Sequence, residues 1–152
     1  MKNLKKQVPQ TLQSIFSEKV TVAAEKENIE KLTRFAEDFF VRAKCPKGMI
    51  TDFCVVIDEA AANICSYAYP AGTAGTMSLS CRFDKALGEY GVSFADSGIP
   101  FDPREVPAAD TSAPASERAI GGLGIHIMRT LMDDIRYEYS DGRNILSMMK
   151  RI

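Results

Sequence analysis

The sequence lacks the motifs of several large enzyme and nucleotide-binding classes. A single histidine among 152 residues disfavours a histidine-based catalytic triad and a zinc site of the usual spacing. No GxxxxGK[ST] run is present and no GxGxxG follows a predicted strand, which disfavours P-loop and Rossmann nucleotide folds. No stretch approaches the roughly 20 apolar residues of a membrane-spanning helix, so we expect no membrane partner.

The chain also lacks a net charge of either sign. Lysine and arginine number 19 and aspartate and glutamate 20, so no overall field favours nucleic acid, and we expect no direct nucleic-acid binding. The four cysteines form no CxxC pair and are most simply reduced thiols. The basic N-terminus has no apolar signal-peptide core. These features predict a cytoplasmic protein.

The periodic segments predict one domain of the α+β class. Helices packed on one face of a mixed, mainly antiparallel sheet would form a two-layer α/β sandwich. We expect an N-terminal extension over 1–15 and a single domain over 16–152, with a Pro-, Ala- and Ser-rich lid at about 103–120. The predicted strands are 16–24, 75–83, 89–95, 134–140 and a last strand ending at 150, and the predicted helices are 26–44, about 52–67 and 121–132, with a break over 45–48 between the first two helices.

Glu59 and Asn63 are the informative polar pair of the second predicted helix. They stand four residues apart in an otherwise apolar run, so they share one face of the helix. They are either aimed together at a polar ligand, or simply solvated or bonded to each other. The apolar residues at helical spacing, which predict the core-facing stripe, are Phe53, Ile57, Ala60, Ala61, Ile64 and Ala68.

Two further motifs lie towards the C-terminus. The run ADSGIPFDP places Asp96 at the end of a predicted strand, where its side chain can meet a ligand, although DSGIP alone equally fits an ordinary turn. Gly121-Gly122-Leu123-Gly124 opens the third predicted helix. A glycine-rich helix start offers free N–H groups and a positive dipole end to phosphate, and a plain helix cap explains one glycine more readily than three.

In their order and spacing these three motifs resemble the N, G1 and G2 boxes of the GHKL superfamily of ATP-binding proteins. The segments EAAANICSYAYP, ADSGIPFDP and GGLGIHIMRTLMDDIRYEYSDGRN look most like the anti-sigma regulatory factors with serine kinase activity, the RsbW type. The resemblance extends from about residue 20 to the C-terminus. It implies the Bergerat-type ATP-binding fold, with ATP and Mg²⁺ as cofactors.

The resemblance also implies a role for each motif. Glu59 would act as the base that deprotonates an attacking hydroxyl, and the Asn63 amide oxygen would be the magnesium ligand. Asp96 would accept a hydrogen bond from the adenine amino group, which guanine lacks at that position, and Gly98 would let the backbone approach the base. The predicted phosphate-binding residues are Gly121, Gly122, Leu123 and Gly124, together with Arg118, which resembles the family's lid arginine and is equally compatible with a solvated side chain.

Two positions depart from the family pattern. Tyr67 stands where many relatives have histidine, and Gly142-Arg143-Asn144 occupies the place of a Gly-Thr pair, which weakens the case for a hydroxyl contact to the nucleotide there.

The resemblance leads to three functional hypotheses. The first is an ATP-dependent protein serine kinase that phosphorylates a STAS-domain anti-sigma-factor antagonist and sequesters a sigma factor. The second is a non-kinase module that binds ATP and controls a partner by binding alone, and the third is an α/β domain without a nucleotide. Many family members are dimers, so a homodimer is among the assemblies that the resemblance implies.

Overall fold

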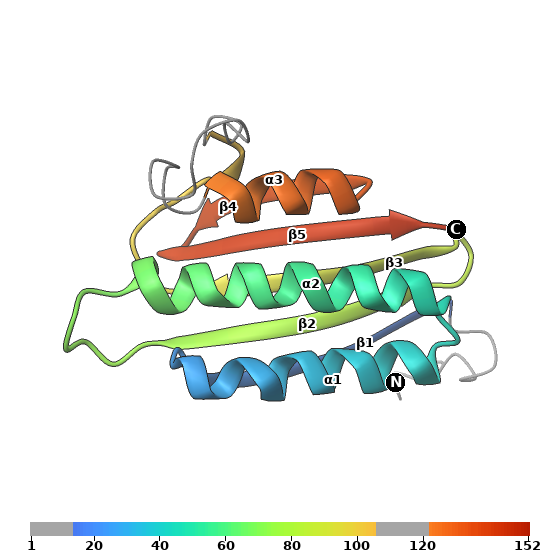
Figure 1. Cartoon of the computed structure of the whole chain (residues 1–152), viewed down its shortest axis with the longest axis horizontal. Helices are drawn as coiled ribbons and strands as arrows, with labels where there is room; N and C mark the ends of the chain where they lie inside the picture. Colours follow the sequence, from blue (N-terminus) through green and yellow to red (C-terminus); the bar gives the residue numbers. More distant parts are fainter. Residues whose placement is uncertain (1–13, 106–121) are drawn as a thin grey trace, which may run out of the picture.

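A computed structural model describes residues 14–105 and 122–152 of the chain, and within them a sheet of five strands is covered on one face by three α-helices (Figure 1). Each neighbouring pair of these strands is antiparallel, so the predicted α+β two-layer fold is confirmed, with no parallel pair among the described strands. The predicted lid lies almost wholly outside the described residues. In sheet order the strands are β1 (Ile15–Ala23), β2 (Thr76–Asp84), β3 (Glu89–Asp96), β5 (Arg143–Arg151) and β4 (Asp134–Ser140).

The register of the central strands follows from their alternating side chains. In β3, Val92 and Phe94 are buried, and they pair with Met148 and Leu146 of β5. Because side chains alternate across a strand, a slip of one residue would turn this apolar row to the outer face. The same register brings Asp96 opposite Asn144 at one end of the sheet.

The helices are α1 (Ile29–Arg42), preceded by a 3₁₀ turn η2 (Lys26–Asn28), α2 (Lys47–Asn63) and α3 (Gly122–Leu131). The predicted break over 45–48 is wrong in its second half, because α2 begins at Lys47, directly after Pro46. Pro46 has the extended backbone of a helix-flanking residue (φ −56°, ψ 138°), and its ring fixes φ without needing an N–H. None of the described helices is long and apolar enough to span a membrane.

Helix α2 lies centrally on the sheet, between α1 and α3 (Figure 1). Its predicted core stripe is confirmed, since every residue of the stripe is buried. The helix ends in a π-helical turn, η3 (Ile64–Ala68), immediately after Asn63. Such turns are rare and concentrate at functional sites because they redirect the side chains around them.

Lys150 ties three of these elements together. Its ammonium group donates to the carboxylate of Asp52 in α2, at 3.0 Å, and to the carbonyl of Leu131 at the C-terminus of α3, at 2.6 Å. The cation therefore also satisfies a backbone acceptor that a helix end leaves open. This contact holds the C-terminal end of α3 against α2 and the sheet.

We expect Lys150→Met to destabilise the fold by about 1.5–3 kcal/mol, the range for hydrogen bonds to charged groups, because Asp52 and the Leu131 carbonyl lose their donor. Arg34→Met is the matched control, since the Arg34–Glu30 pair is exposed, with side chains 76% and 72% accessible, and should contribute under about 0.5 kcal/mol. Urea unfolding of both variants measures the difference. Equal losses would show that Lys150 is no more than a surface charge.

Candidate functional site

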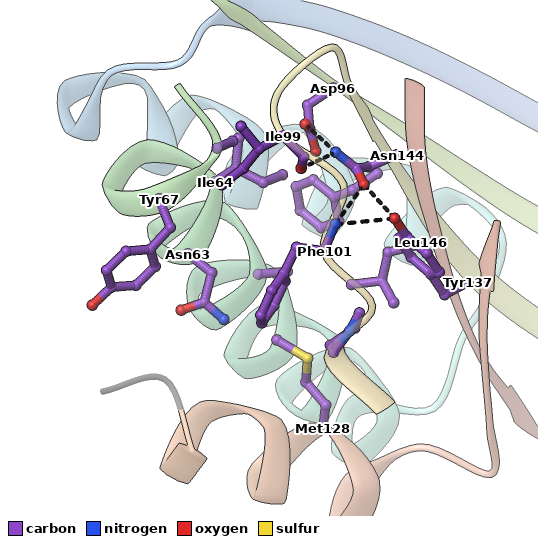
Figure 2. A pocket seen from close by; sticks show the side chains of 14 residues that line it. Asn63, Ile64, Tyr67, Asp96, Ile99, Phe101, Met128, Tyr137, Asn144 and Leu146 are labelled. Atoms are coloured by element: carbon purple, nitrogen blue, oxygen red, sulfur yellow. Dashed lines mark hydrogen bonds between the residues drawn. The ribbon is translucent and has the colours of Figure 1, made fainter. Parts of the chain in front are cut away.

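A pocket opens at the end of the sheet where α2 finishes and β5 begins. Figure 2 shows that its side chains come from both layers, with Asn63 on one wall and Asp96 and Asn144 on another. Its volume is about 80 Å³, well below the several hundred typical of pockets that enclose a whole drug-sized ligand. The lining residues are Ala60, Asn63, Ile64, Tyr67, Ala68, Phe94, Asp96, Ile99, Phe101, Pro103, Met128, Tyr137, Asn144 and Leu146.

Asn63 and Glu59 lie on the α2 side of this site. Both side chains are half-buried, and no hydrogen bond joins them or links either one to another described residue. The interpretation that they bond to each other is therefore wrong. A half-buried amide and a half-buried carboxylate, both without partners, leave polar atoms available to a ligand.

Glu59 lies against the first turn of α3. A Cβ atom placed on Gly124 would stand only 2.6 Å from Glu59 Oε2, so any larger residue at position 124 would displace the carboxylate. The predicted base and one of the predicted phosphate-binding glycines therefore lie side by side. An anion beside the N-terminal turn of a helix is favoured by the helix dipole. Glu59 itself is one turn away from the pocket-lining Asn63 and is not part of the pocket wall.

Asp96 is buried at the end of β3, with 6% of its surface exposed. Its Oδ1 accepts the N–H of Gly98, at 2.9 Å, and the Nδ2 of Asn144, at 3.0 Å. DSGIP therefore does form a turn that Asp96 stabilises, but these two hydrogen bonds occupy only one oxygen of the Asp96 carboxylate. Oδ2 accepts no hydrogen bond from the described residues, and Asp96 lines the pocket, so this oxygen is available to a donor there.

Gly98 is needed at its position for a reason that the sequence did not indicate. A Cβ atom there would lie 2.3 Å from the carbonyl oxygen of Ala68, in the π-helical turn. The close approach that excludes a side chain is therefore between two backbone segments of the protein. This contact also sets the distance between α2 and the chain leaving β3.

Asn144 and Tyr137 are site residues that the sequence analysis missed. Asn144 is 6% exposed, and its Oδ1 accepts hydrogen bonds from the Phe101 N–H, at 3.1 Å, and from the Tyr137 hydroxyl. The sequence signal was the two-residue period of a strand. Asn144 lies on the same face of its strand as the inward-facing Leu146 and Met148, and Tyr137 lies on the same face as Ile135. A polar residue on the inward face of a strand indicates a buried network.

Burial also affects the ionisation of the pocket wall. It raises the pKa of the Tyr137 phenol above its ordinary value, so the hydroxyl remains a donor at neutral pH. Next to the pocket, the Arg104 guanidinium hydrogen-bonds the carboxylate of Asp102 and holds the pKa of Asp102 below its ordinary range. The Arg104 carbonyl in turn accepts a hydrogen bond from Arg129 of α3. The segment following Phe101 is thereby fastened to α3.

The remaining predicted site residues are only partly described. Arg118 and Gly121 lie outside the described residues, so their predicted roles stay predictions. Gly122 and Leu123 form the start of α3, as predicted, and Gly124 follows them. No cluster of three or more His, Cys, Asp or Glu side chains with metal-binding geometry occurs in 14–105 and 122–152.

Two proteins of known type share sequence with this chain. The chain is 31% identical over 101 residues to a protein named serine-protein kinase RsbW from Bacillus thuringiensis (strain Al Hakam), a match that covers 64% of this chain and 61% of that protein. A protein of the same name from Bacillus cereus (strain AH820) is 30% identical over the same coverage. The chain thus matches less than two thirds of the length of these relatives.

A solved structure shares the fold. The crystal structure of the RsbU and RsbW domains of Rv1364c from Mycobacterium tuberculosis matches 90% of this chain and 32% of that chain, with a TM-score of 0.62 at 12% identity. The family model for the histidine kinase-like ATPase domain matches residues 22–150, which include the pocket and both helices beside it. The chain therefore belongs to the histidine kinase-like ATPase domain family, as a distant homologue of the RsbW serine-protein kinases.

Proposed function

We propose that this chain is an ATP-dependent protein serine kinase that acts as an anti-sigma regulatory factor. Its substrate would be a serine of a STAS-domain antagonist, and in the absence of that partner it would sequester a sigma factor. The observation that carries the proposal is that Asn63 and Asp96, from opposite layers, line one pocket, with the free carboxylate of Glu59 one helical turn away. The family match and the RsbW homologues point in the same direction.

The pocket supports adenine as the part of ATP that enters. Apolar side chains such as Ile64, Phe94 and Leu146 make up most of its wall, which suits the faces of an aromatic ring. The open Oδ2 of Asp96 can accept a hydrogen bond from the exocyclic amino group. The ribose and phosphates would lie outside the pocket, towards Asn63 and the first turn of α3, where a helix N-terminus favours anions.

Glu59 supplies the proton acceptor for the transfer step. The serine hydroxyl oxygen of the partner forms a bond to the γ-phosphorus, the bond from that phosphorus to the β–γ bridging oxygen breaks, and ADP leaves. The serine proton passes to the Glu59 carboxylate, which has no described hydrogen-bond partner. An amide at this position would lack the required basicity.

The donor set fits magnesium held jointly by protein and nucleotide. Magnesium keeps several waters and needs few protein ligands when phosphate oxygens are present, and the unpaired amide of Asn63 offers one hard oxygen. When bound, the ion would supply charge neutralisation at the phosphates. No cage of carboxylates exists within the described ranges, so ATP and the ion would be expected to bind together.

We expect Asp96→Asn to weaken ATP binding by about 10- to 100-fold, measured by calorimetry with Mg-ATP. The reason is the loss of one hydrogen bond to a charged acceptor, which contributes roughly 1.5–3 kcal/mol. Asp134→Asn is the matched control, because Asp134 lies on β4 and pairs with the exposed Arg136, away from the pocket. Loss of affinity in both variants, or in neither, would contradict the assignment of Asp96.

Glu59→Gln should leave the ATP dissociation constant within about threefold and reduce phosphoryl transfer about 100-fold or more, since a positioned base contributes roughly that factor. The measurement is transfer of labelled γ-phosphate to serine in a panel of STAS-domain antagonists from the same organism. Asp58→Asn, an exposed neighbour on the same helix, should transfer at the wild-type rate. Wild-type protein that binds ATP without labelling any antagonist would instead support a module that regulates by binding alone.

A further inference from the structure

The loop Ser97–Phe101, which leaves β3 and forms one rim of the pocket, has all of its backbone donors in use. The Ser97 N–H donates to the Tyr69 hydroxyl oxygen, at 2.9 Å, and the Ile99 N–H donates to the Ala68 carbonyl, at 2.9 Å. The Gly98 N–H is bonded to Asp96, and proline at position 100 has no N–H. The Phe101 N–H donates to both Asn144 Oδ1 and the Tyr137 hydroxyl oxygen, at 3.1 Å each.

This arrangement determines how the loop can treat a ligand. Loops that grip phosphate do so through free backbone N–H groups. The 97–101 loop has no such group left, so its contribution to binding is shape and apolar surface, from side chains such as Ile99 and Phe101, which are 58% and 47% exposed. The loop is also held by three other parts of the chain, which means that its form does not depend on a bound nucleotide.

Asn144 has no capacity left for a ligand. Its Nδ2 donates to Asp96 Oδ1 and to the Ile99 carbonyl, at 3.0 and 2.9 Å, and has the Gly98 carbonyl as a longer third acceptor at 3.4 Å. Its Oδ1 accepts from the Phe101 N–H and the Tyr137 hydroxyl, as Figure 2 shows. An amide has two donor hydrogens and two acceptor lone pairs, so the four shorter bonds already use all of them. The backbone groups of Ile99 and Phe101 also fix which end of the amide faces which partner.

We propose that Asn144, supported by Tyr137, is the positioning residue of the base site and does not contact the nucleotide itself. By engaging Asp96 Oδ1, it leaves Oδ2 as the one acceptor of that carboxylate that reads the base, and it fastens the 97–101 loop to β5 before the nucleotide arrives. This inference rests on the proposed ATP binding. Gly142-Arg143-Asn144 occupies the place of the family's Gly-Thr pair, and on this inference its asparagine helps to form the site before the nucleotide binds.

Tyr137→Phe is the first test, because it removes only the hydroxyl that bonds Asn144 and the Phe101 amide. We expect amide hydrogen exchange at Phe101, followed by NMR in the free protein, to become at least about tenfold faster. The Ser97 amide, held by Tyr69, should change less than threefold and serves as the internal reference. Tyr139→Phe is the matched control on the same strand, since Tyr139 is 47% exposed, and it should leave Phe101 exchange unchanged.

Asn144→Ala is the second test. We expect KM for ATP to rise about tenfold or more and the preference for ATP over GTP to fall, with kcat at saturating ATP within about twofold of wild type. Asn144→Thr should restore part of the affinity, because a hydroxyl can still donate to Asp96. Asn28→Ala, which removes an exposed side-chain bond to the Ala23 carbonyl, should change none of these values.

The outcomes separate this inference from the proposed function. If Tyr137→Phe and Asn144→Ala both keep wild-type exchange at Phe101 and wild-type ATP affinity, the positioning role is wrong while ATP binding stands. If Asn144→Ala does not fold, Tyr137→Phe alone decides. If the wild-type protein binds no ATP, the proposed function fails, and faster Phe101 exchange in Tyr137→Phe would still support the preformed loop.

Discussion

The pairing of β3 with β5 is the constraint on which the pocket depends. Apolar side chains fix the register over the middle of these strands, where Phe94 lies opposite Leu146 and Val92 opposite Met148. Because the period of a strand is two, this register leaves no freedom at the strand ends. Asp96 must then lie opposite Asn144, and a buried carboxylate meets a buried amide. Core packing thus places the polar pair that organises the site.

The two layers contribute different parts of the site. The sheet supplies Asp96, Asn144 and Tyr137, which hydrogen-bond one another or the 97–101 loop and form a rigid wall. The helices supply Asn63 and Glu59, which have no described partners. The hydrogen-bonded side of the pocket thus faces polar groups that are available to a ligand. Gly98 permits the close contact between the chain leaving β3 and the π-helical turn, and Gly124 permits the close contact between α3 and Glu59 of α2.

Much of this fold could be predicted from the sequence because its signals are local. Alternation in β2 and β3 and helical spacing in α1 and α2 each lie within a dozen or so residues, and the three boxes stand in a recognisable order. The start of α2 was predicted too late because Pro46 and Gly48 resemble a break, whereas the extended backbone of Pro46, with φ fixed by its ring, leads directly into the helix.

The network around the 97–101 loop could not be predicted in the same way. Its bonds join residues that are far apart in sequence, such as Tyr69 with Ser97 and Asn144 with Asp96, and no periodicity connects them. The need for Gly98 likewise comes from a π-helical turn that brings the Ala68 carbonyl within reach, and π-helical turns have no simple sequence signal. The roles proposed for Glu59 and Asn63 rest on the family resemblance, since a polar pair on a helix is ordinarily solvated.

The decisive measurement is a crystal structure of the protein with magnesium and a non-hydrolysable ATP analogue. We expect the adenine ring in the pocket with its amino group bonded to Asp96 Oδ2, the metal on Asn63, and the 97–101 loop and Asn144 unmoved with no contact to the base. A nucleotide bound elsewhere, or a base that displaces Asn144 from Asp96, would contradict this expectation.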